Sequence, residues 1–438
     1  MASTLVFDHL AYLDQLPNYE QQMPSVSDGA FGLDRMRRLL GGLGAPERQW
    51  PSLHVAGTKG KGSTCALLAA ILRAAGYRVG LYTSPHLIDP RERIQLNGRW
   101  VEEAELTEAV AAVREAATQL GETPTYFEAY TAAAFWLFAR WSVEIAVVEV
   151  GLGGRLDATN VLDPLVTVIT PISLDHTDVL GTTVTAIARE KTGIMKTGRP
   201  VVVAPQTDGV LSELRTVATA RRAPWVEVQE AARVETVAVS VEGQRVTIQT
   251  PRRTYPGITL PLLGAHQRVN LATALLALEA LPDSWIISSG AVAAGVAAVQ
   301  WPGRLQIVTR RPWVILDGAQ NAASAAALAE AVRTLWPGHP VHLILGISSN
   351  KDVEGVAQAL VSLVASVTAT QSGHPRALPV RELAARLSPW YPAVSTAETV
   401  TEAVARLRQS CTEEACIVVT GSFYLLGELL SAVPISHG

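Results

Sequence analysis

The clearest chemical signal in the chain is the run Gly57-Thr58-Lys59-Gly60-Lys61-Gly62-Ser63-Thr64. It follows a short apolar stretch, Leu53–Ala56, and precedes an alanine- and leucine-rich stretch, which places it where a strand turns into a helix. Glycines there let backbone N–H groups crowd a phosphate, and the helix dipole favours negative charge. Lys61 can reach the outer phosphates of a nucleotide, and Ser63 or Thr64 can ligate magnesium. The run therefore predicts an ATP-binding phosphate loop.

The match to the general P-loop pattern is imperfect in two places. Val55 stands where the pattern has its first glycine, and Gly62 separates Lys61 from Ser63. A glycine-rich turn with solvated lysines is the alternative interpretation.

Two further residues fit a metal site beside this loop. Glu149 lies within the apolar run Val147–Val150, where a carboxylate is costly unless it is paired or binds a metal. His176 follows the next apolar run, Val166–Thr170, and ligands gather at the carboxyl ends of parallel strands. The glycines after Glu149 do not form a dinucleotide-binding fingerprint, because Leu156 occupies the third glycine position.

The elements that must position these residues alternate between short β-branched runs and longer periodic runs, as βα units around a mainly parallel sheet do. The predicted strands are Leu53–Ala56, Arg78–Tyr82, Ile145–Val150, Val166–Thr170 and Pro200–Ala204, with helices Ser63–Ala75, Glu103–Leu120 and Phe127–Trp141 between them.

Between about 223 and 261 the pattern changes to strict alternation, with Thr236–Val241 and Arg245–Gln249 joined by a turn, which predicts a β-hairpin. Helices are expected at Gln267–Ala280 and Ala291–Val299.

A second α/β region begins after the Pro and Gly of Trp301–Arg304. Its predicted strands are Trp313–Leu316, Val341–Leu345, Leu363–Ala369 and Ala415–Val419, and its helices are Asn321–Leu335, Val353–Val361, Val380–Leu387 and Thr399–Arg408. The fold class is therefore α/β: a P-loop ATPase-like domain with a mainly parallel sheet and a small hairpin region over 1–302, and a Rossmann-like α/β domain over 303–438.

Composition narrows the classes of protein. The 438 residues are 48% hydrophobic and 17% charged, which is typical of a folded chain with a large core. A net charge of -4 with no basic cluster longer than a pair does not indicate a nucleic-acid partner. Polar Ser3 and Thr4 and acidic Asp8 argue against a secretory signal, and the apolar runs fall short of the roughly 20 residues of a membrane span.

The number and spacing of the cysteines indicate the cellular compartment in which the protein is expected. Cys65, Cys411 and Cys416 are an odd number without a CxxC pair, so neither a disulfide framework nor a zinc site is indicated. A cytoplasmic location is expected.

Taken together, the motifs resemble the folylpolyglutamate synthase/dihydrofolate synthase family, a branch of the Mur ligases. The segments that carry the resemblance keep their order over nearly the whole chain: GTKGKGST, TSPHLIDPRERIQLNG (Thr83–Gly98), VEVGLGGRLDATN (Val148–Asn160), Ile172–Lys196, GAHQRVNLATA (Gly264–Ala274), WPGR, Asp317–Asn321, HPRAL and TGSFYLLGE.

The resemblance implies a metal site and a modified lysine. Ser63, Ser84 and Glu149 are similar to ligands of the magnesium that bridges the ATP phosphates, and Glu149 with His176 to a second magnesium site. Lys191 matches the lysine that the family carries as a carbamate. Carbon dioxide would convert its amine into an anionic oxygen ligand, which two Mg²⁺ ions would favour.

The resemblance also implies the nucleotide and pterin contacts. Asn270, Arg304 and Asp317 match positions that hold ATP, and Lys61, Lys191, His176 and Asp317 form the implied catalytic set. The pterin contacts are expected at Thr125, Phe127, Asp157 and Ala158, and the segment Ser84–Gly98 resembles the family's mobile loop over the pterin-binding cleft. Where family members commonly have His, this chain has Gln320, which can hydrogen-bond but cannot carry a proton or charge at neutral pH.

The implied reaction joins L-glutamate to the carboxylate of dihydropteroate, of a reduced folate, or of both, through an acyl phosphate. A monomer with ATP, two Mg²⁺ ions and small-molecule substrates is expected, without nucleic acid or membrane. A monofunctional folylpolyglutamate synthase, a cell-wall Mur ligase, a P-loop kinase or nucleotide switch, and a non-catalytic nucleotide-binding scaffold are the alternatives.

Overall fold

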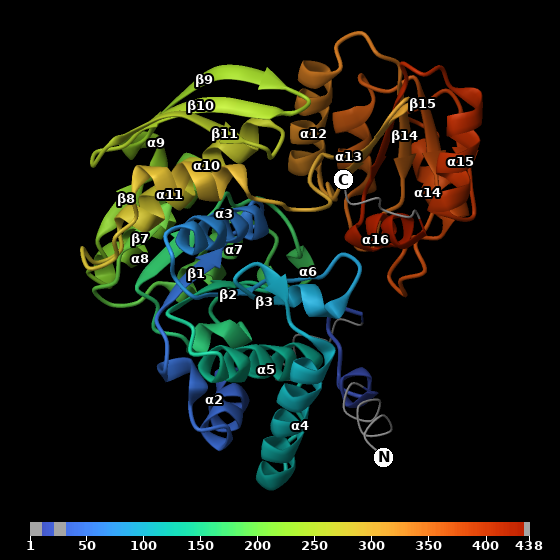
Figure 1. The fold of residues 1–438 in the computed structure, drawn as a ribbon. Helices are drawn as coiled ribbons and strands as arrows, with labels where there is room; N and C mark the ends of the chain where they lie inside the picture. Colours follow the sequence, from blue (N-terminus) through green and yellow to red (C-terminus); the bar gives the residue numbers. More distant parts are fainter. Residues whose placement is uncertain (1–10, 22–31, 433–438) are drawn as a thin grey trace.

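Three β-sheets organise the part of the chain that the computed structural model describes, residues 11–21 and 32–432 (Figure 1). The expectation that rests on Ser3, Thr4 and Asp8 lies outside the described residues. Two of the sheets belong to the first two thirds of the chain, and the third begins at Gln306. None of the described helices is both long and apolar enough to cross a bilayer.

The largest sheet has eight strands, and the six from β2 to β8 are parallel. In spatial order they are β4 (Arg99–Trp100), β3 (Ile94–Leu96), β2 (Val79–Tyr82), β5 (Ile145–Glu149), β1 (Ser52–Ala56), β6 (Val166–Ile169), β7 (Val201–Val203) and β8 (Trp225–Glu227). Every residue of the three central strands is buried, which explains their continuous apolar runs. Val55 pairs with Glu149 and Ala56 with Ile169, so these strands end level with one another.

Helices cover both faces of this sheet because successive strand residues point to opposite sides. Val147 packs in a core with α3 (Lys61–Ala74), α10 (Ala265–Glu279) and α11 (Ser289–Ala297). Val148 packs in another core with α2 (Leu33–Gly42), α4 (Glu103–Leu120) and α5 (Tyr126–Arg140). Beyond these lie α6 (Thr177–Leu180), α7 (Val184–Lys191), α8 (Asp208–Ala220) and α9 (Val228–Ala231).

The sequence predicts a hairpin of two strands in this region, and the structure adds a third strand. The structure has a three-stranded antiparallel sheet of β9 (Arg233–Ser240), β10 (Gly243–Gln249) and β11 (Thr254–Leu260). Pro256 and Gly257 interrupt the alternation of β11, and both residues weaken a strand pattern, which is why the sequence did not reveal it. Ile258 and Val246 face the core that contains α10 and α11.

The third sheet has the order β12-β13-β17-β14-β15-β16, in which only β12 is antiparallel to its neighbour. Its strands are β12 (Gln306–Arg310), β13 (Trp313–Asp317), β17 (Cys416–Thr420), β14 (Val341–Leu345), β15 (Ser366–Ala369) and β16 (Val394–Thr396). Its helices are α12 (Ala322–Leu335), α13 (Val353–Leu360), α14 (Val380–Leu387), α15 (Val400–Ser410) and α16 (Phe423–Ala432). The sequence missed β12 and β16, which are the two edge strands and lack a buried face.

The α/β class with two separate sheet units is confirmed, and several predicted bounds agree with the observed ones, as at Glu103–Leu120 and Val341–Leu345. The division into domains 1–302 and 303–438 remains a proposal.

Candidate functional site

A cavity of about 600 Å³ lies where the carboxyl ends of β1, β5 and β6 face the C-terminal unit. All the predicted site residues except Thr64 line it, including Ser63, Ser84 and Lys191. Thr64 is buried in the first turn of α3, and its Oγ1 has no hydrogen-bond partner among the described residues. Residues from sequence positions 19 to 424 therefore share one space.

The phosphate loop needs its glycines for both conformation and space. Gly57 has a φ of 151° and Gly60 a φ of 83°, which side chains rarely adopt. A Cβ at Gly57 would lie 1.8 Å from Thr170 Oγ1, and one at Gly60 would lie 2.4 Å from Asn270 Oδ1. The loop is thus packed against β6 on one side and α10 on the other.

The extra glycine between Lys61 and Ser63 has a tertiary explanation. A Cβ on Gly62 would lie 2.8 Å from the indole of Trp301, in the segment that leads into the C-terminal unit. The irregular spacing therefore lets the start of α3 approach this linker closely.

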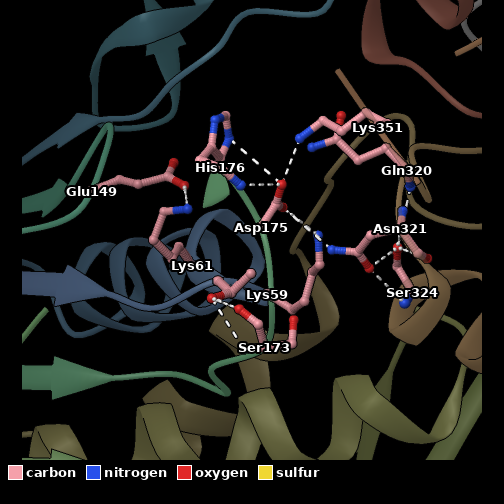
Figure 2. Close-up of polar contacts among 11 residues, drawn as sticks. Lys59, Lys61, Glu149, Ser173, Asp175, His176, Gln320, Asn321, Ser324 and Lys351 are labelled. Atoms are coloured by element: carbon pink, nitrogen blue, oxygen red, sulfur yellow. Dashed lines mark hydrogen bonds and ion pairs between the residues drawn. The ribbon is translucent and has the colours of Figure 1, made fainter. Parts of the chain in front are cut away.

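The two lysines of the loop contact different carboxylates (Figure 2). Lys61 Nζ lies 3.7 Å from Glu149 Oε1, and Glu149 Oε2 accepts a hydrogen bond of 3.2 Å from the backbone N–H of Ser84. Burial raises the pKa of Glu149, although Lys61 opposes the shift. Lys59 Nζ instead lies 3.0 Å from Asp175 Oδ2.

Asp175 is a site residue that the sequence interpretation missed. Its carboxylate also accepts from Lys351 Nζ at 2.5 Å and from Asn321 Nδ2 at 3.3 Å, both in the C-terminal unit. Burial alone would raise the pKa of Asp175, but Lys59 and Lys351 outweigh it and hold the pKa well below its usual range. Lys351 is distant in sequence, so no local pattern marks this contact.

His176 stands beside Asp175 in a left-handed conformation, with φ 50°. Burial, with Lys351 next, lowers its pKa to about 3, so the imidazole is neutral at physiological pH. Its buried Nδ1 has no partner among the described residues. A neutral imidazole with a free nitrogen lining a phosphate site suits a metal ligand.

Lys191 closes the same side of the cavity at the end of α7. It is buried, and no hydrogen bond or ion pair joins its Nζ to another described residue. Burial lowers the pKa of Lys191 to about 7, with Lys61 adding to the shift. A large share of the amine is thus neutral near physiological pH.

The residues expected to hold ATP come from three elements. Asn270 on α10 donates to Gln267 Oε1 at 2.9 Å. Arg304 lies in the linker, with its guanidinium 4.3 Å from the centre of the Phe423 ring and its Nε without a partner among the described residues. Asp317, at the end of β13, accepts from the backbone N–H of Leu305 at 3.0 Å, so it also fixes the linker beside Arg304.

The four expected pterin contacts also line the cavity, and Phe127 and Ala158 add apolar surface to it. A Cβ on Gly151 would lie 2.4 Å from the Phe127 ring, which shows how closely the ring packs under that loop. Thr125 caps α5 through a 3.2 Å bond from Glu128 N–H. Asp157, next to buried Ala158, accepts from the Leu152 N–H at 2.8 Å and therefore also shapes the loop.

Gln320 lines the cavity too, and its backbone N–H donates to Ser324 Oγ at 3.1 Å. Figure 2 draws it with Lys351 and Asn321 on the C-terminal side of the site. Arg376 and Tyr424 also line the cavity, although the sequence motifs HPRAL and TGSFYLLGE gave them no assigned role.

The residues fit a magnesium site that ligand oxygens complete. The described residues contain no group of three or more His, Cys, Asp or Glu side chains that could hold a metal ion by themselves. Magnesium in nucleotide sites is commonly held by one or two carboxylates with substrate phosphates and water. Glu149, the orphaned nitrogen of His176 and the hydroxyls of Ser63 and Ser84 provide such a partial set.

Comparison with known proteins agrees over nearly the whole chain. The Mur ligase middle domain matches residues 55–278, and the Mur ligase glutamate ligase domain matches residues 303–423. The chain is 34% identical over 407 residues to the dihydrofolate synthase/folylpolyglutamate synthase of Bacillus subtilis, covering 91% of this chain and 94% of that protein.

Solved structures show the same likeness in three dimensions. Mycobacterium tuberculosis folylpolyglutamate synthase complexed with ADP and AMPPCP superposes with a TM-score of 0.88 at 34% identity, covering 99% of each chain. E. coli FolC in complex with DHPP and ADP superposes with a TM-score of 0.87 at 32% identity, covering 98% of this chain and 97% of that one.

Proposed function

The chain belongs to the folylpolyglutamate synthase/dihydrofolate synthase family of Mur ligases, and we propose that it ligates L-glutamate to the carboxylates of both dihydropteroate and a reduced folate. It is an ATP-dependent ligase. The observation that carries the proposal is the single cavity, which joins the phosphate loop, the wall around Phe127 and the C-terminal unit.

The chemistry has two steps. The acceptor carboxylate attacks the γ-phosphorus of ATP, ADP leaves, and an acyl phosphate forms. The amine of glutamate then attacks the acyl carbon, and inorganic phosphate leaves from the tetrahedral intermediate with loss of the amine proton. Lys61 and Arg304 stabilise the negative charge on the transferring phosphoryl group, which is the main help that a protein gives to such a transfer.

Ser63, Ser84, Glu149 and His176 would hold two Mg²⁺ ions, with Lys191 as a carbamate. Bound magnesium supplies positive charge that neutralises the phosphate oxygens. The carbamate is supported by a buried lysine whose amine makes no hydrogen bond or ion pair with another described residue and whose pKa is lowered by burial, because carbon dioxide adds only to the neutral amine. The carbamate is an anion, and the positive charge of the magnesium ions would therefore attract it.

The position of the cavity between two α/β units supports the exclusion of water, which would otherwise hydrolyse the acyl phosphate. Three free cysteines, Cys65, Cys411 and Cys416, are compatible with the cytoplasmic monomer that we propose.

The test is glutamate-dependent ADP release with dihydropteroate or tetrahydrofolate as acceptor. Release with both acceptors is expected. Release with tetrahydrofolate alone would identify a monofunctional folylpolyglutamate synthase. Preference for another amino acid would favour a cell-wall type of ligase, and ATP turnover that ignores glutamate would favour a kinase or nucleotide switch.

A further inference from the structure

Arg376 and Tyr424 form a polar pair on the C-terminal wall of the cavity. Arg376 lies between β15 and α14, and Tyr424 lies in the first turn of α16. The positive charge of Arg376 lies close enough to the Tyr424 hydroxyl to oppose the rise in its pKa that burial causes. Arg376 Nε is buried without a hydrogen-bond partner, and no carboxylate within the described ranges lies within ion-pair distance of this arginine.

The pair is held in place from both sides. The backbone carbonyl of Arg376 accepts from Ser349 N–H at 2.8 Å, and its backbone N–H donates to His374 Nδ1 at 3.2 Å. The His374 ring also stacks on the Tyr424 ring, with centroids 3.7 Å apart and planes 15° from parallel. A ligand would therefore meet a preorganised guanidinium and hydroxyl, which lowers the entropic cost of binding.

The surrounding charges do not neutralise Arg376. The carboxylate that influences it, Glu20, accepts from Arg93 Nη1 at 2.7 Å and from Arg93 Nη2 at 2.6 Å, so both oxygens are occupied. His86, which accepts from Arg93 Nε, is neutral because burial lowers its pKa to about 4. Among the described residues, Arg376 therefore has no carboxylate partner of its own at this corner of the cavity.

Two other charged groups near the pair are already engaged. Glu428 Oε1 accepts from the Gly373 N–H at 2.6 Å, and burial raises the pKa of that carboxyl. Lys351, on the same unit, lies against Asp175. A partly buried cation without a partner is costly, and the cost falls when a ligand anion pairs with it.

We propose that Arg376 and Tyr424 bind a carboxylate of a glutamate unit. The inference rests on the proposed function, because the substrates of that reaction carry this group. A guanidinium fork matches the two oxygens of a carboxylate, and the phenol adds a further donor. The glutamate unit has two sources: the incoming amino acid, or the glutamate already present in a folate acceptor and absent from dihydropteroate.

The test compares KM values for L-glutamate, tetrahydrofolate, dihydropteroate and ATP in Arg376→Gln and Tyr424→Phe. Arg381→Gln is the matched control, because Arg381 is exposed on the adjoining helix α14. Loss of the charged hydrogen bonds should raise one KM roughly 10- to 100-fold in Arg376→Gln and less in Tyr424→Phe. Thermal unfolding of each variant checks that the fold is intact.

The pattern of KM values identifies the source. A rise for L-glutamate with either acceptor assigns the pair to the incoming amino acid. A rise for tetrahydrofolate, with dihydropteroate unchanged, assigns it to the acceptor's own glutamate. KM values that match those of Arg381→Gln, or that rise equally for all four substrates, would overturn the carboxylate site while leaving the ligase assignment intact. Wild-type protein without glutamate-dependent ADP release would reject the proposed function itself.

Discussion

At the scale of single residues, lysine and arginine occupy different parts of this molecule. The chain has only five lysines, and four of them, Lys59, Lys61, Lys191 and Lys351, line the cavity. The fifth, Lys196, bonds to Asn160. Lysine is a compact charge whose pKa shifts readily when it is buried, whereas arginine stays charged. Within the cavity, burial lowers the pKa of Lys59 to about 8 and that of Lys191 to about 7.

Lys61→Ala should lower kcat by roughly 100-fold or more, because it removes a preorganised positive charge from the transferring phosphoryl group. Glutamate-dependent ADP release at saturating ATP is the measurement. Arg140→Ala removes an exposed positive charge at the end of α5 and should leave kcat near the wild-type value. Near-normal turnover of Lys61→Ala would contradict its proposed role.

Carbamylation of Lys191 should depend on pH in a defined direction. With its pKa lowered to about 7, the amine is mostly neutral at pH 8 and only about one tenth neutral at pH 6, so the carbamate should decline as the pH falls. Carbon-13 NMR of protein equilibrated with labelled bicarbonate and magnesium measures it, and Lys191→Arg is the blank. An unmodified amine at pH 8 would reject the carbamate.

At the scale of elements, the phosphate loop depends on what packs around it as well as on its own sequence. Gly57, Gly60 and Gly62 are each fixed by a different neighbour: Thr170 on the loop after β6, Asn270 on α10, and Trp301 in the linker. Glycine is needed at these positions because a Cβ would collide there. The loop, the helix that follows the small sheet, and the linker therefore pack closely together around the proposed nucleotide site.

Gly60→Ala should raise the KM for ATP by at least tenfold, because its Cβ would displace Asn270 and the left-handed backbone would be strained by about 1–2 kcal/mol. Gly76→Ala is the matched control: Gly76 has a φ of 95° and nothing within 4 Å of an added Cβ. Gly76→Ala should lower the free energy of unfolding by a similar amount, because its backbone is strained in the same way. Its KM for ATP should stay normal. Equal KM values in the two variants would exclude the steric explanation.

At the scale of the whole molecule, Asp175 links the two α/β units. It follows β6 of the large sheet, while Lys351 follows β14 of the third sheet and Asn321 caps α12 (Figure 2). Lys59 of the phosphate loop shares the same carboxylate. The relative position of the units is thus coupled to the phosphate loop through one buried side chain.

Asp175→Asn should lower the free energy of unfolding by about 3–5 kcal/mol, because it leaves two partly buried lysines without their counter-charge. Asp163→Asn breaks an exposed pair with Arg199 and should cost no more than about 1 kcal/mol. Urea unfolding compares the two variants. The difference between wild type and Asp175→Asn should be full at neutral pH, begin to shrink only below about pH 4, and continue to shrink as the pH falls toward the depressed folded-state pKa of Asp175. A loss as small as that of Asp163→Asn would show that the cluster adds no stability.

The sequence by itself determined the features that depend on neighbours along the chain. The strand, glycine turn and helix around Lys61, the buried run that carries Glu149, and the alternation of strands and helices all follow from local pattern and backbone preference. The level ends of β1, β5 and β6 then bring Gly57, Glu149 and the loop before His176 to one edge, as parallel strands require.

Only the tertiary structure decided which groups pair across long separations. Asp175 meets Lys351 across 176 positions, and Gly62 meets Trp301. Arg376, which has no ion pair among the described residues, lines a cavity built largely by the other unit. Ion pairing and steric fit act over a few ångströms in space and leave no periodic signal along the chain. Strand β11 was missed for a related reason: burial against α10 and α11 stabilises a segment whose local sequence, with Pro256 and Gly257, disfavours a strand.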